Sequence, residues 1–285
     1  MLAVAGTVPL ADLPVLEGAV DLERGQLRVE GAVLDLDRGT PALLAAACAA
    51  ARVLGRETPH AFLVGDTGTG RGSRLLYAHL ARRLPATPAS VLAFHYFLPD
   101  ADWHNTVLFA AQAMHPMPRL VADAGFMYAA KMSGQAGEYD LFTPDAGELA
   151  FLADENAPHP FYARGFLLAE ENKAPELIQR AAATGGAAQH MLVKGAMDRV
   201  VRGGEILYEV DGPSVEAMEA MGGTGDTLTG LACALMESGH GTAEACLIAA
   251  RANRLAGALA QPTPASRIHE IVDRIPEALE QVLRS

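Results

Sequence analysis

The sequence predicts an α/β protein in which helices cover both faces of a mainly parallel sheet. Short apolar runs of the kind that form buried strands alternate with longer Ala- and Leu-rich segments that are typical of helices. No stretch rich in Pro, Gly or Ser is long enough to separate domains. We therefore expect a single domain, residues 1–285, with its ligand site at the carboxyl ends of the strands.

The expected elements follow from these runs in chain order. Strands are expected at residues 2–5, 62–64, 90–94, 119–122, 141–142 and 191–193. The helices between them are expected at residues 41–54, 73–84, 106–114, 146–153 and 175–183. From Thr224 onward the pattern is largely helical, with helices expected at residues 228–238, 242–260 and 268–283. These helices are expected to complete the same domain.

Residues 18–37 show a different pattern. Pairs of apolar residues spaced two apart are separated by turn signals at residues 24–25 and 30–31. This spacing is typical of short antiparallel strands. We interpret the stretch as a β-hairpin insert or edge of the domain.

The charge balance restricts the class of partner. The chain has 34 acidic and 22 basic side chains and a net charge of -12. Such a surface repels phosphodiester backbones, so we expect no nucleic-acid partner. An anionic cofactor is still permitted, because backbone N–H groups and one lysine create a local positive field.

The sequence also lacks the signals of a membrane or metal-thiolate protein. The longest uninterrupted apolar run, residues 42–51, is far too short to span a bilayer, and no basic residue precedes the apolar stretch at residues 1–10. The three cysteines, Cys48, Cys233 and Cys246, have no metal-ligand spacing and are expected to be buried thiols. We expect a cytoplasmic protein without a membrane partner.

The strongest chemical signal is the glycine cluster GGTGDTLTG at residues 222–230. Glycines allow a sharp turn and a close approach to a ligand, and the first free N–H groups of the helix that follows point at an anion. Asp226 lies in the first turn of this helix, where its carboxylate could accept a proton from a substrate hydroxyl. The alternative is that Asp226 only stabilises the helix N-terminus.

Two further residues have the right positions for phosphate or metal chemistry. Lys194 follows an apolar strand directly, so its ammonium group should lie at the carboxyl edge of the sheet, unless it is an ordinary solvated lysine. Glu148 lies near the start of a helix, where it could hold Mg²⁺ through water or simply complement the helix dipole.

Together these motifs resemble the ribokinase-like superfamily, and in particular its ADP- or ATP-dependent NAD(P)H-hydrate dehydratase branch. The cluster at residues 222–230 carries the resemblance with four other stretches in family order. Residues 64–71 (VGDTGTGR) resemble a loop that usually contains GPGLGR, residues 142–148 (FTPDAGE) resemble TPHPGE, residues 192–195 (LVKG) resemble a strand-end lysine-glycine pair, and residues 121–124 (VADA) resemble Asp-Ala-Asp.

The resemblance implies a three-layer α/β/α ribokinase-like fold, ADP or ATP with Mg²⁺ as cofactors, and assembly as a homo-oligomer. Asp226 would be the general base, and Glu148 would hold Mg²⁺ through water. The implied nucleotide site is Lys194, Gly195, Gly222, Gly223, Thr224 and Gly225. The implied substrate site is Gly65, Asp66, Gly68, Gly70, Asp123 and Asp145.

The sequence departs from the family pattern at three places. Asp145 replaces the His of TPHPGE, and Asp66-Thr67 replaces a Pro, so a carboxylate would face a site for an anionic dinucleotide. Residues 95–105 have no counterpart in the family, yet they contain the only Trp, two His and two Asp. This stretch either lines a pocket or packs as a loop on its aromatic residues. His95, Asp100 and His104 could in principle bind zinc.

The sequence supports three hypotheses for function. The first is a dehydratase that repairs hydrated NADH or NADPH, and the second is a kinase that phosphorylates a small alcohol such as a sugar or a hydroxymethyl heterocycle. The third is a nucleotide sensor without turnover, which Asp226 argues against, because a binding site gains nothing from a carboxylate beside phosphate.

Overall fold

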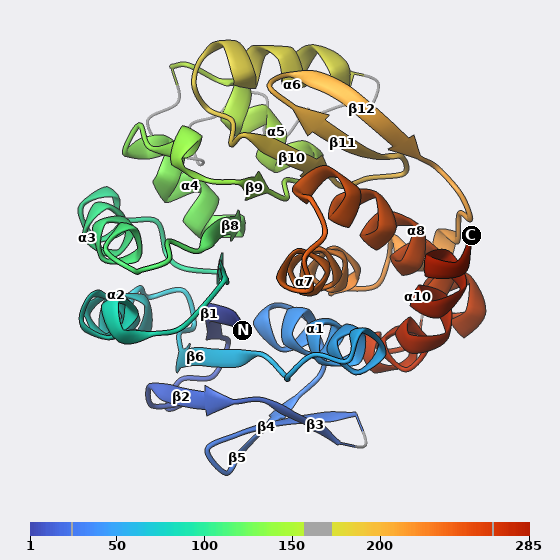
Figure 1. Ribbon diagram of the computed structural model, residues 1–285, viewed down its shortest axis with the longest axis horizontal. Coiled ribbons are helices and arrows are strands. Elements are labelled where there is room, and N and C mark those ends of the chain that lie inside the picture. The colour runs from blue at the N-terminus through green and yellow to red at the C-terminus, as the bar shows by residue number, and fades with distance from the viewer. Residues whose placement is uncertain (24, 157–172, 264) are drawn as a thin grey trace.

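A large sheet lies between two layers of helices in the computed structural model, which describes residues 1–23, 25–156, 173–263 and 265–285 (Figure 1). The strands of this sheet are β1 (Leu2–Val8), β2 (Leu16–Ala19), β6 (His60–Gly65), β7 (Val91–His95), β8 (Arg119–Asp123), β9 (Leu141–Phe142), β10 (His190–Val193), β11 (Asp198–Arg202) and β12 (Glu205–Val210). They lie in the order β12-β11-β10-β9-β8-β7-β1-β6-β2. The six adjacent strands β10, β9, β8, β7, β1 and β6 are parallel. At the edges of the sheet, β2, β11 and β12 pair antiparallel. The predicted α/β fold with a mainly parallel sheet is confirmed.

Each face of the sheet has its own helices and its own apolar core (Figure 1). One face carries α2 (Arg71–Arg83), α3 (Ala101–Gln112), α4 (Ala124–Met132), α5 (Ala146–Ala153) and α6 (Ala174–Ala183). The other carries α1 (Thr40–Leu54), α7 (Thr224–Glu237), α8 (Thr242–Ala260), α9 (Ile268–Val272) and α10 (Ile275–Arg284). Single-turn 3₁₀ helices lie at Leu84–Ala86, Ala136–Glu138 and Glu216–Met218. No helix in the described part of the chain is long and apolar enough to cross a membrane.

Residues 18–37 contain the antiparallel strands that the sequence predicted. β3 (Asp21–Glu23), β4 (Gln26–Val29) and β5 (Ala32–Asp35) form a separate three-stranded sheet, whereas β2 joins the main sheet beside β6. The inward side chains of the small sheet belong to the core on the α1 face. The chain then leaves β5 and enters α1 through Arg38 and Gly39, so this segment sets where α1 begins.

All the expected strands and helices are present, but three features differ from the prediction. α4 and the β11–β12 hairpin were not predicted, because α4 is apolar on nearly all sides and β12 is mostly exposed. The single helix expected at residues 268–283 is divided into α9 and α10. Pro276 explains the division, because proline fits the first turn of a helix and disrupts the interior of one.

Helices α1 and α7 approach each other closely because small residues line their contact. α1 is Ala-rich and buried over residues 40–51. At Gly230 of α7, a Cβ atom would lie 2.2 Å from the backbone oxygen of Leu43 in α1. At Gly6 of β1, a Cβ atom would lie 2.5 Å from the hydroxyl of Thr40. The N-terminus of α1 can therefore lie against the sheet, next to the N-terminus of α7.

This packing predicts that Gly230→Ala destabilises the protein by about 1–3 kcal/mol, the usual cost of forcing a methyl group into a close-packed contact. Gly137→Ala is the matched control, since a Cβ atom there meets nothing within 4 Å. Denaturant unfolding of both variants checks the prediction, and equal midpoints would contradict it.

Candidate active site

Two cavities lie at the carboxyl ends of the parallel strands, and Tyr96 lines both. The larger cavity, about 440 Å³, is bounded by the ends of β8 and β10 and by the starts of α5 and α7, with Asp123, Asp145, Glu148, Lys194, Gly195, Gly223, Thr224, Gly225 and Asp226 in its wall. The smaller cavity, about 410 Å³, is bounded by Thr7, Pro9, Arg38, Gly39, Asp66, Gly68, Ser73, Tyr96, Phe97 and Leu98. The residues expected to bind nucleotide, apart from Gly222, therefore line the larger cavity, and Asp66 and Gly68 of the first glycine loop line the smaller one.

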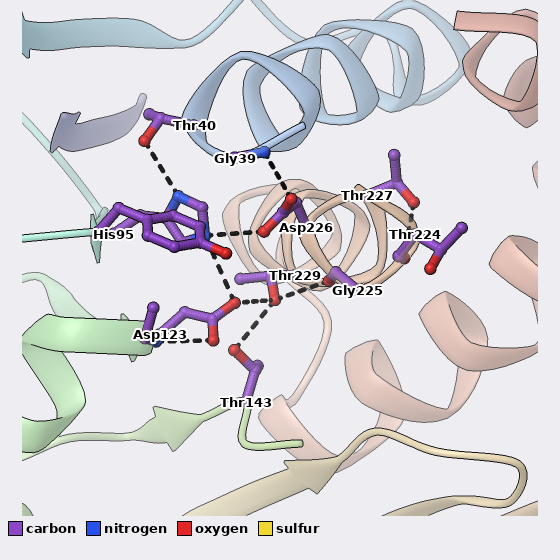
Figure 2. Close-up of polar contacts among 12 residues, drawn as sticks. Gly39, Thr40, His95, Asp123, Thr143, Thr224, Gly225, Asp226, Thr227 and Thr229 are labelled. Atoms are coloured by element: carbon purple, nitrogen blue, oxygen red, sulfur yellow. Dashed lines mark hydrogen bonds and ion pairs between the residues drawn. The ribbon is translucent and has the colours of Figure 1, made fainter. Parts of the chain in front are cut away.

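Asp226 lies in the first turn of α7, as the sequence predicted, and its side chain also reaches the start of α1 (Figure 2). The N–H of Gly39, the residue that precedes α1, donates to Asp226 Oδ2 at 2.6 Å. His95 Nε2 lies 3.1 Å from Asp226 Oδ1. The carboxylate thus sits at the N-termini of two helices, whose dipoles both favour a negative charge.

Asp226 is held in its ionised form despite being 8% exposed. Burial alone would raise its pKa, but the hydrogen bond and charge of His95, the charge of Lys194 and the N–H of Gly39 outweigh burial and hold the pKa below its usual value. An ionised carboxylate beside a cavity is the form required of a general base.

The start of α7 offers backbone donors to the larger cavity. Gly223 precedes the helix with a φ of 100°, a conformation that favours glycine. The first N–H groups of the helix, those of Thr224, Gly225 and Asp226, have no partner within the helix. At Gly225, a Cβ atom would lie 3.3 Å from the side chain of Lys194, so glycine lets the lysine pass close to the helix start. This arrangement suits an anion.

Gly222 lies at the edge of this loop rather than in the wall of the cavity. A Cβ atom at Gly222 would lie 3.3 Å from the side chain of Arg38, so the glycine makes room for that arginine.

Lys194 is already paired, which differs from the free cation that the sequence suggested. Its Nζ lies 3.0 and 3.1 Å from the two carboxylate oxygens of Asp123, the last residue of β8. Burial alone would lower the pKa of Lys194, but Asp123, Glu148 and Asp226 raise it, so the side chain stays charged. Thr229 of α7 also donates to Asp123 Oδ2 at 2.7 Å (Figure 2). Asp123, which was expected to contact substrate, lines the larger cavity and also links β8, β10 and α7.

Arg254 of α8 binds the backbone of the loop that follows β10. Gly195 N–H donates to Asp198 Oδ1 at 3.2 Å, and its carbonyl accepts from Arg254 at 2.8 Å. Arg254 also donates to Asp198 Oδ2 at 2.8 Å. Gly195, expected to contact the nucleotide, therefore lines the larger cavity with its backbone groups engaged within the protein.

Asp145 and Glu148 form a capping box at the start of α5. Asp145 Oδ1 accepts from the N–H of Glu148 at 2.7 Å, and Glu148 Oε2 accepts from the N–H of Asp145 at 2.8 Å. Burial, the largest effect, raises the pKa of Glu148 to about 8, although Lys194 opposes the shift. A cation in the larger cavity would favour the ionised form of Glu148. The oxygen atoms of Asp145 and Glu148 are of the type that binds Mg²⁺, so these residues fit the expected ion.

Asp66 lines the smaller cavity, but its carboxylate is hydrogen-bonded by residues of its own loop. Its two oxygens accept from the N–H groups of Gly68, Gly70 and Ser73 and from the Ser73 hydroxyl, at 2.8–3.1 Å. Burial alone would raise the pKa of Asp66, but these bonds hold it below its usual value. The repulsion expected between Asp66 and an anionic substrate is therefore weakened by the donors of the loop.

Gly65 has a packing role at the end of β6, because a Cβ atom there would lie 2.1 Å from the carbonyl oxygen of Leu10. It does not appear in the wall of either cavity, unlike Gly68. Gly70 opens α2 in the left-handed conformation.

Residues 95–105 divide between the site and the core. His95 ends β7 and contacts Asp226, whereas Asp100 caps α3 by accepting from Trp103 N–H. The two ring nitrogens of His104 lie 2.8 Å from the Tyr139 hydroxyl and 2.9 Å from the Ser133 hydroxyl. The zinc hypothesis for His95, Asp100 and His104 is therefore wrong, because each side chain has a separate set of partners.

His95, Asp123 and Asp226 do bring potential ligand atoms within 4.8 Å of one another. The ammonium group of Lys194 already bonds Asp123, and His95 already faces Asp226, so we assign no metal to this cluster. The sequence analysis did not identify Arg38 or Gly39 as site residues, and it considered His95 only as a possible zinc ligand in a stretch that could line a pocket. The signals available were the glycine directly before a helix and a histidine at the end of a strand.

Comparison with known proteins places the chain in a family. Residues 98–277 match the NAD(P)H-hydrate dehydratase family, also called the carbohydrate kinase family, and the chain belongs to it. The matched segment includes Asp226, Lys194 and Glu148, but it does not include His95 or the loop at residues 64–71. Family and fold together define an enzyme of the NAD(P)H-hydrate dehydratase or carbohydrate kinase type.

Two relatives show how far the likeness extends. An uncharacterized protein of Methanocaldococcus jannaschii is 38% identical over 221 residues, which cover 77% of this chain and 90% of the relative. The ADP-dependent (S)-NAD(P)H-hydrate dehydratase of Cenarchaeum symbiosum is 31% identical over 143 residues, or 50% of this chain and 45% of that enzyme. The chain thus matches less than half the length of this dehydratase.

Solved structures confirm the ribokinase-like fold. A ribokinase-like superfamily protein from Enterococcus faecalis has a TM-score of 0.59 at 16% identity, covering 99% of this chain and 86% of its own. The pyridoxal kinase of Staphylococcus aureus, in complex with AMP-PCP and pyridoxal, has a TM-score of 0.55 at 16% identity, covering 89% of this chain and 86% of its own.

The raised pKa of Glu148 predicts a pH-dependent stability. The ordinary pKa is 4.5 and the value in the folded protein is about 8, so the unfolded chain loses this proton first. The stabilisation is therefore fully present below pH 4.5 and is lost as the pH rises through about 8.

Glu148→Gln should remove this loss, so the variant should gain stability relative to the unmodified protein between pH 5 and pH 8, on the order of 1 kcal/mol per pH unit. Denaturant unfolding at the two pH values measures the difference, with Glu57→Gln at an exposed position as control. A parallel pH dependence in all three proteins would contradict the assignment.

Proposed function

We propose that the protein is a nucleotide-dependent NAD(P)H-hydrate dehydratase that repairs hydrated NADH or NADPH. The observation that carries the proposal is Asp226, an ionised carboxylate at the starts of α1 and α7 beside a cavity lined with backbone donors. Family membership over residues 98–277 supports the substrate class.

The proposed chemistry has two stages. Asp226 accepts the proton of the hydrate hydroxyl, and the oxygen attacks the terminal phosphoryl group of ADP or ATP, whose leaving group departs as AMP or ADP. The phosphorylated carbon then loses phosphate and its neighbour loses a proton, which restores the double bond of the nicotinamide ring. The N–H groups of Thr224 and Gly225 stabilise the negative charge on the moving phosphoryl group.

The cavities suit these roles. ADP or ATP would occupy the larger cavity, against Lys194 and the start of α7, and the hydrate would enter from the smaller cavity past Tyr96. Glu148 and Asp145 would hold Mg²⁺ in the larger cavity, where the ion would neutralise charge on the phosphate oxygens. Assembly as a homo-oligomer stays a prediction.

The direct test is recovery of the reduced-nicotinamide absorbance when the protein and Mg²⁺ are mixed with hydrated NADH and ADP or ATP. Asp226→Asn should lower kcat by about 10²–10⁴-fold, the usual contribution of a general base, while nucleotide binding is retained. If the unmodified protein binds nucleotide yet regenerates no NADH, the dehydratase proposal fails. If Asp226→Asn keeps the activity of the unmodified protein, Asp226 is not the general base.

A small-molecule kinase is the second candidate. It is favoured by Asp145 in place of the family histidine and by the likeness of the fold to pyridoxal kinase, although that likeness shows the fold alone. Consumption of ATP with formation of a stable phosphoester of a sugar or a hydroxymethyl heterocycle would identify this activity. Nucleotide binding with neither activity would support the sensor hypothesis.

Arg38 distinguishes an anionic substrate from a neutral alcohol. Its side chain is exposed, lines the smaller cavity and has no ion-pair partner within the described ranges. Arg38→Met should raise the KM for hydrated NADH about tenfold with little change in kcat, because the guanidinium would bind the dinucleotide phosphates equally in the ground and transition states.

Steady-state kinetics of Arg38→Met and of Arg82→Met, an exposed position of α2 outside both cavities, measure this effect. An unchanged KM would place the phosphates of the substrate away from Arg38.

A further inference from the structure

His95 is fully buried beside Asp226, and it lies outside the segment that matches the family. It ends β7, so its ring is fixed between the sheet and the starts of α1 and α7 (Figure 2). Both ring nitrogens face oxygen atoms. The proton count of the ring therefore follows from what those oxygens can donate.

On the Nδ1 side, the neighbour is the Thr40 hydroxyl at 3.0 Å. That hydroxyl also lies 2.8 Å from the backbone carbonyl of Thr7, which can only accept. A hydroxyl has one proton, and the carbonyl requires it. Nδ1 must then carry a proton and donate it to Thr40.

On the Nε2 side, the neighbours are carboxylates. Asp226 Oδ1 lies at 3.1 Å and Asp123 Oδ2 at 3.7 Å. Asp226 Oδ2 already accepts a hydrogen bond from the N–H of Gly39. Asp123 accepts hydrogen bonds from Lys194, Thr229 and the N–H of Ala124. Both carboxylates therefore act as hydrogen-bond acceptors, as expected of ionised groups. A lone pair on Nε2 would face ionised oxygen, and a proton there forms a charge-assisted bond instead.

We infer that His95 is a doubly protonated imidazolium in the resting protein and that it acts as a positioning residue, fixing Asp226 as an ionised carboxylate in one orientation. The protonation state stands on the contacts alone. The effect on turnover rests on the function proposed above.

The charges around the ring balance. Asp226 from α7 and Asp123 from β8 contribute two negative charges, and His95 and Lys194 contribute two positive ones. The ring of Tyr96 lies edge-on to His95, with centroids 4.4 Å apart, and covers it without adding a charge. Glu148 of α5 lies in the wall of the larger cavity and interacts electrostatically with Lys194 and Asp123.

His104 provides an internal comparison, because it is equally buried but its partners are hydroxyls. The Tyr139 hydroxyl, 2.8 Å from Nε2, can donate a proton, which a carboxylate cannot. Burial lowers the pKa of His104 to about 4, so this ring is neutral. His95 and His104 should therefore differ in proton count at the same pH.

The first experiment is ¹⁵N NMR of the protein labelled at histidine, with ring nitrogens correlated to ring protons. At pH 7 His95 should show two protonated nitrogens, whereas His104 should show one. Asp226→Asn should convert His95 to the singly protonated form and leave the signals of His104 unchanged. A bare nitrogen on His95 in the unmodified protein would overturn the inference, and so would a doubly protonated His95 in Asp226→Asn.

The second experiment separates positioning from structural support. His95→Gln keeps a hydrogen-bond donor but removes the charge, so kcat should fall about a hundredfold and the acidic limb of the kcat profile should move up by about one pH unit. The KM for nucleotide should change little. His240→Gln, at a surface ion pair with Glu244, is the control and should match the unmodified protein.

The two experiments distinguish failure of the function from failure of this inference. The protein could lack dehydratase activity and still have a doubly protonated His95 that loses one proton in Asp226→Asn. That outcome would support the ion pair between His95 and Asp226 and would contradict the proposed function. An active protein in which His95→Gln lowers stability without moving the acidic limb reduces His95 to a packing residue.

Discussion

The stabilisation of Asp226 by groups from three other parts of the fold is the constraint on which this structure depends. A carboxylate buried at the start of α7 would be costly without partners. Gly39 brings the start of α1 to it, His95 brings the end of β7, and Lys194 after β10 adds a nearby positive charge. The close contact of α1 with α7 at Gly230 then becomes a requirement, because a wider separation would move the Gly39 N–H out of reach.

The neutral cluster around Asp226 has a consequence for phosphate binding in a protein with a net charge of -12. Lys194 already neutralises Asp123, and Arg254 pairs with Asp198, so in the described part of the cavity wall an incoming phosphate meets no unpaired side-chain cation. The N-terminus of α7 can stabilise part of the charge of a phosphate through its backbone donors. A divalent ion at Glu148 and Asp145 would supply the rest, and its arrival would also favour the loss of the Glu148 proton.

The sequence predicted the parts of the fold that depend on periodic apolar patterns. The strands of the parallel sheet and helices α5 and α8 lie where expected, because their burial leaves a clear spacing in the chain. The β11–β12 hairpin was missed, since β12 is largely exposed and lacks that spacing. The position of Asp226 at a helix start was also predictable from its glycines. Its bonds to Gly39 and His95 were not, because they join residues 187 and 131 positions apart and depend on tertiary packing.

The small sheet of β3, β4 and β5 ends just before Arg38 and Gly39. The proposed base belongs to residues 98–277, which match the family, whereas Gly39 and His95 lie before residue 98. Residues 98–277 alone would carry Asp226 and Lys194 but would lack the contacts from Gly39 and His95. A chimera that joined residues 1–97 to another family member would therefore test whether Gly39 and His95 still meet a carboxylate at the start of α7.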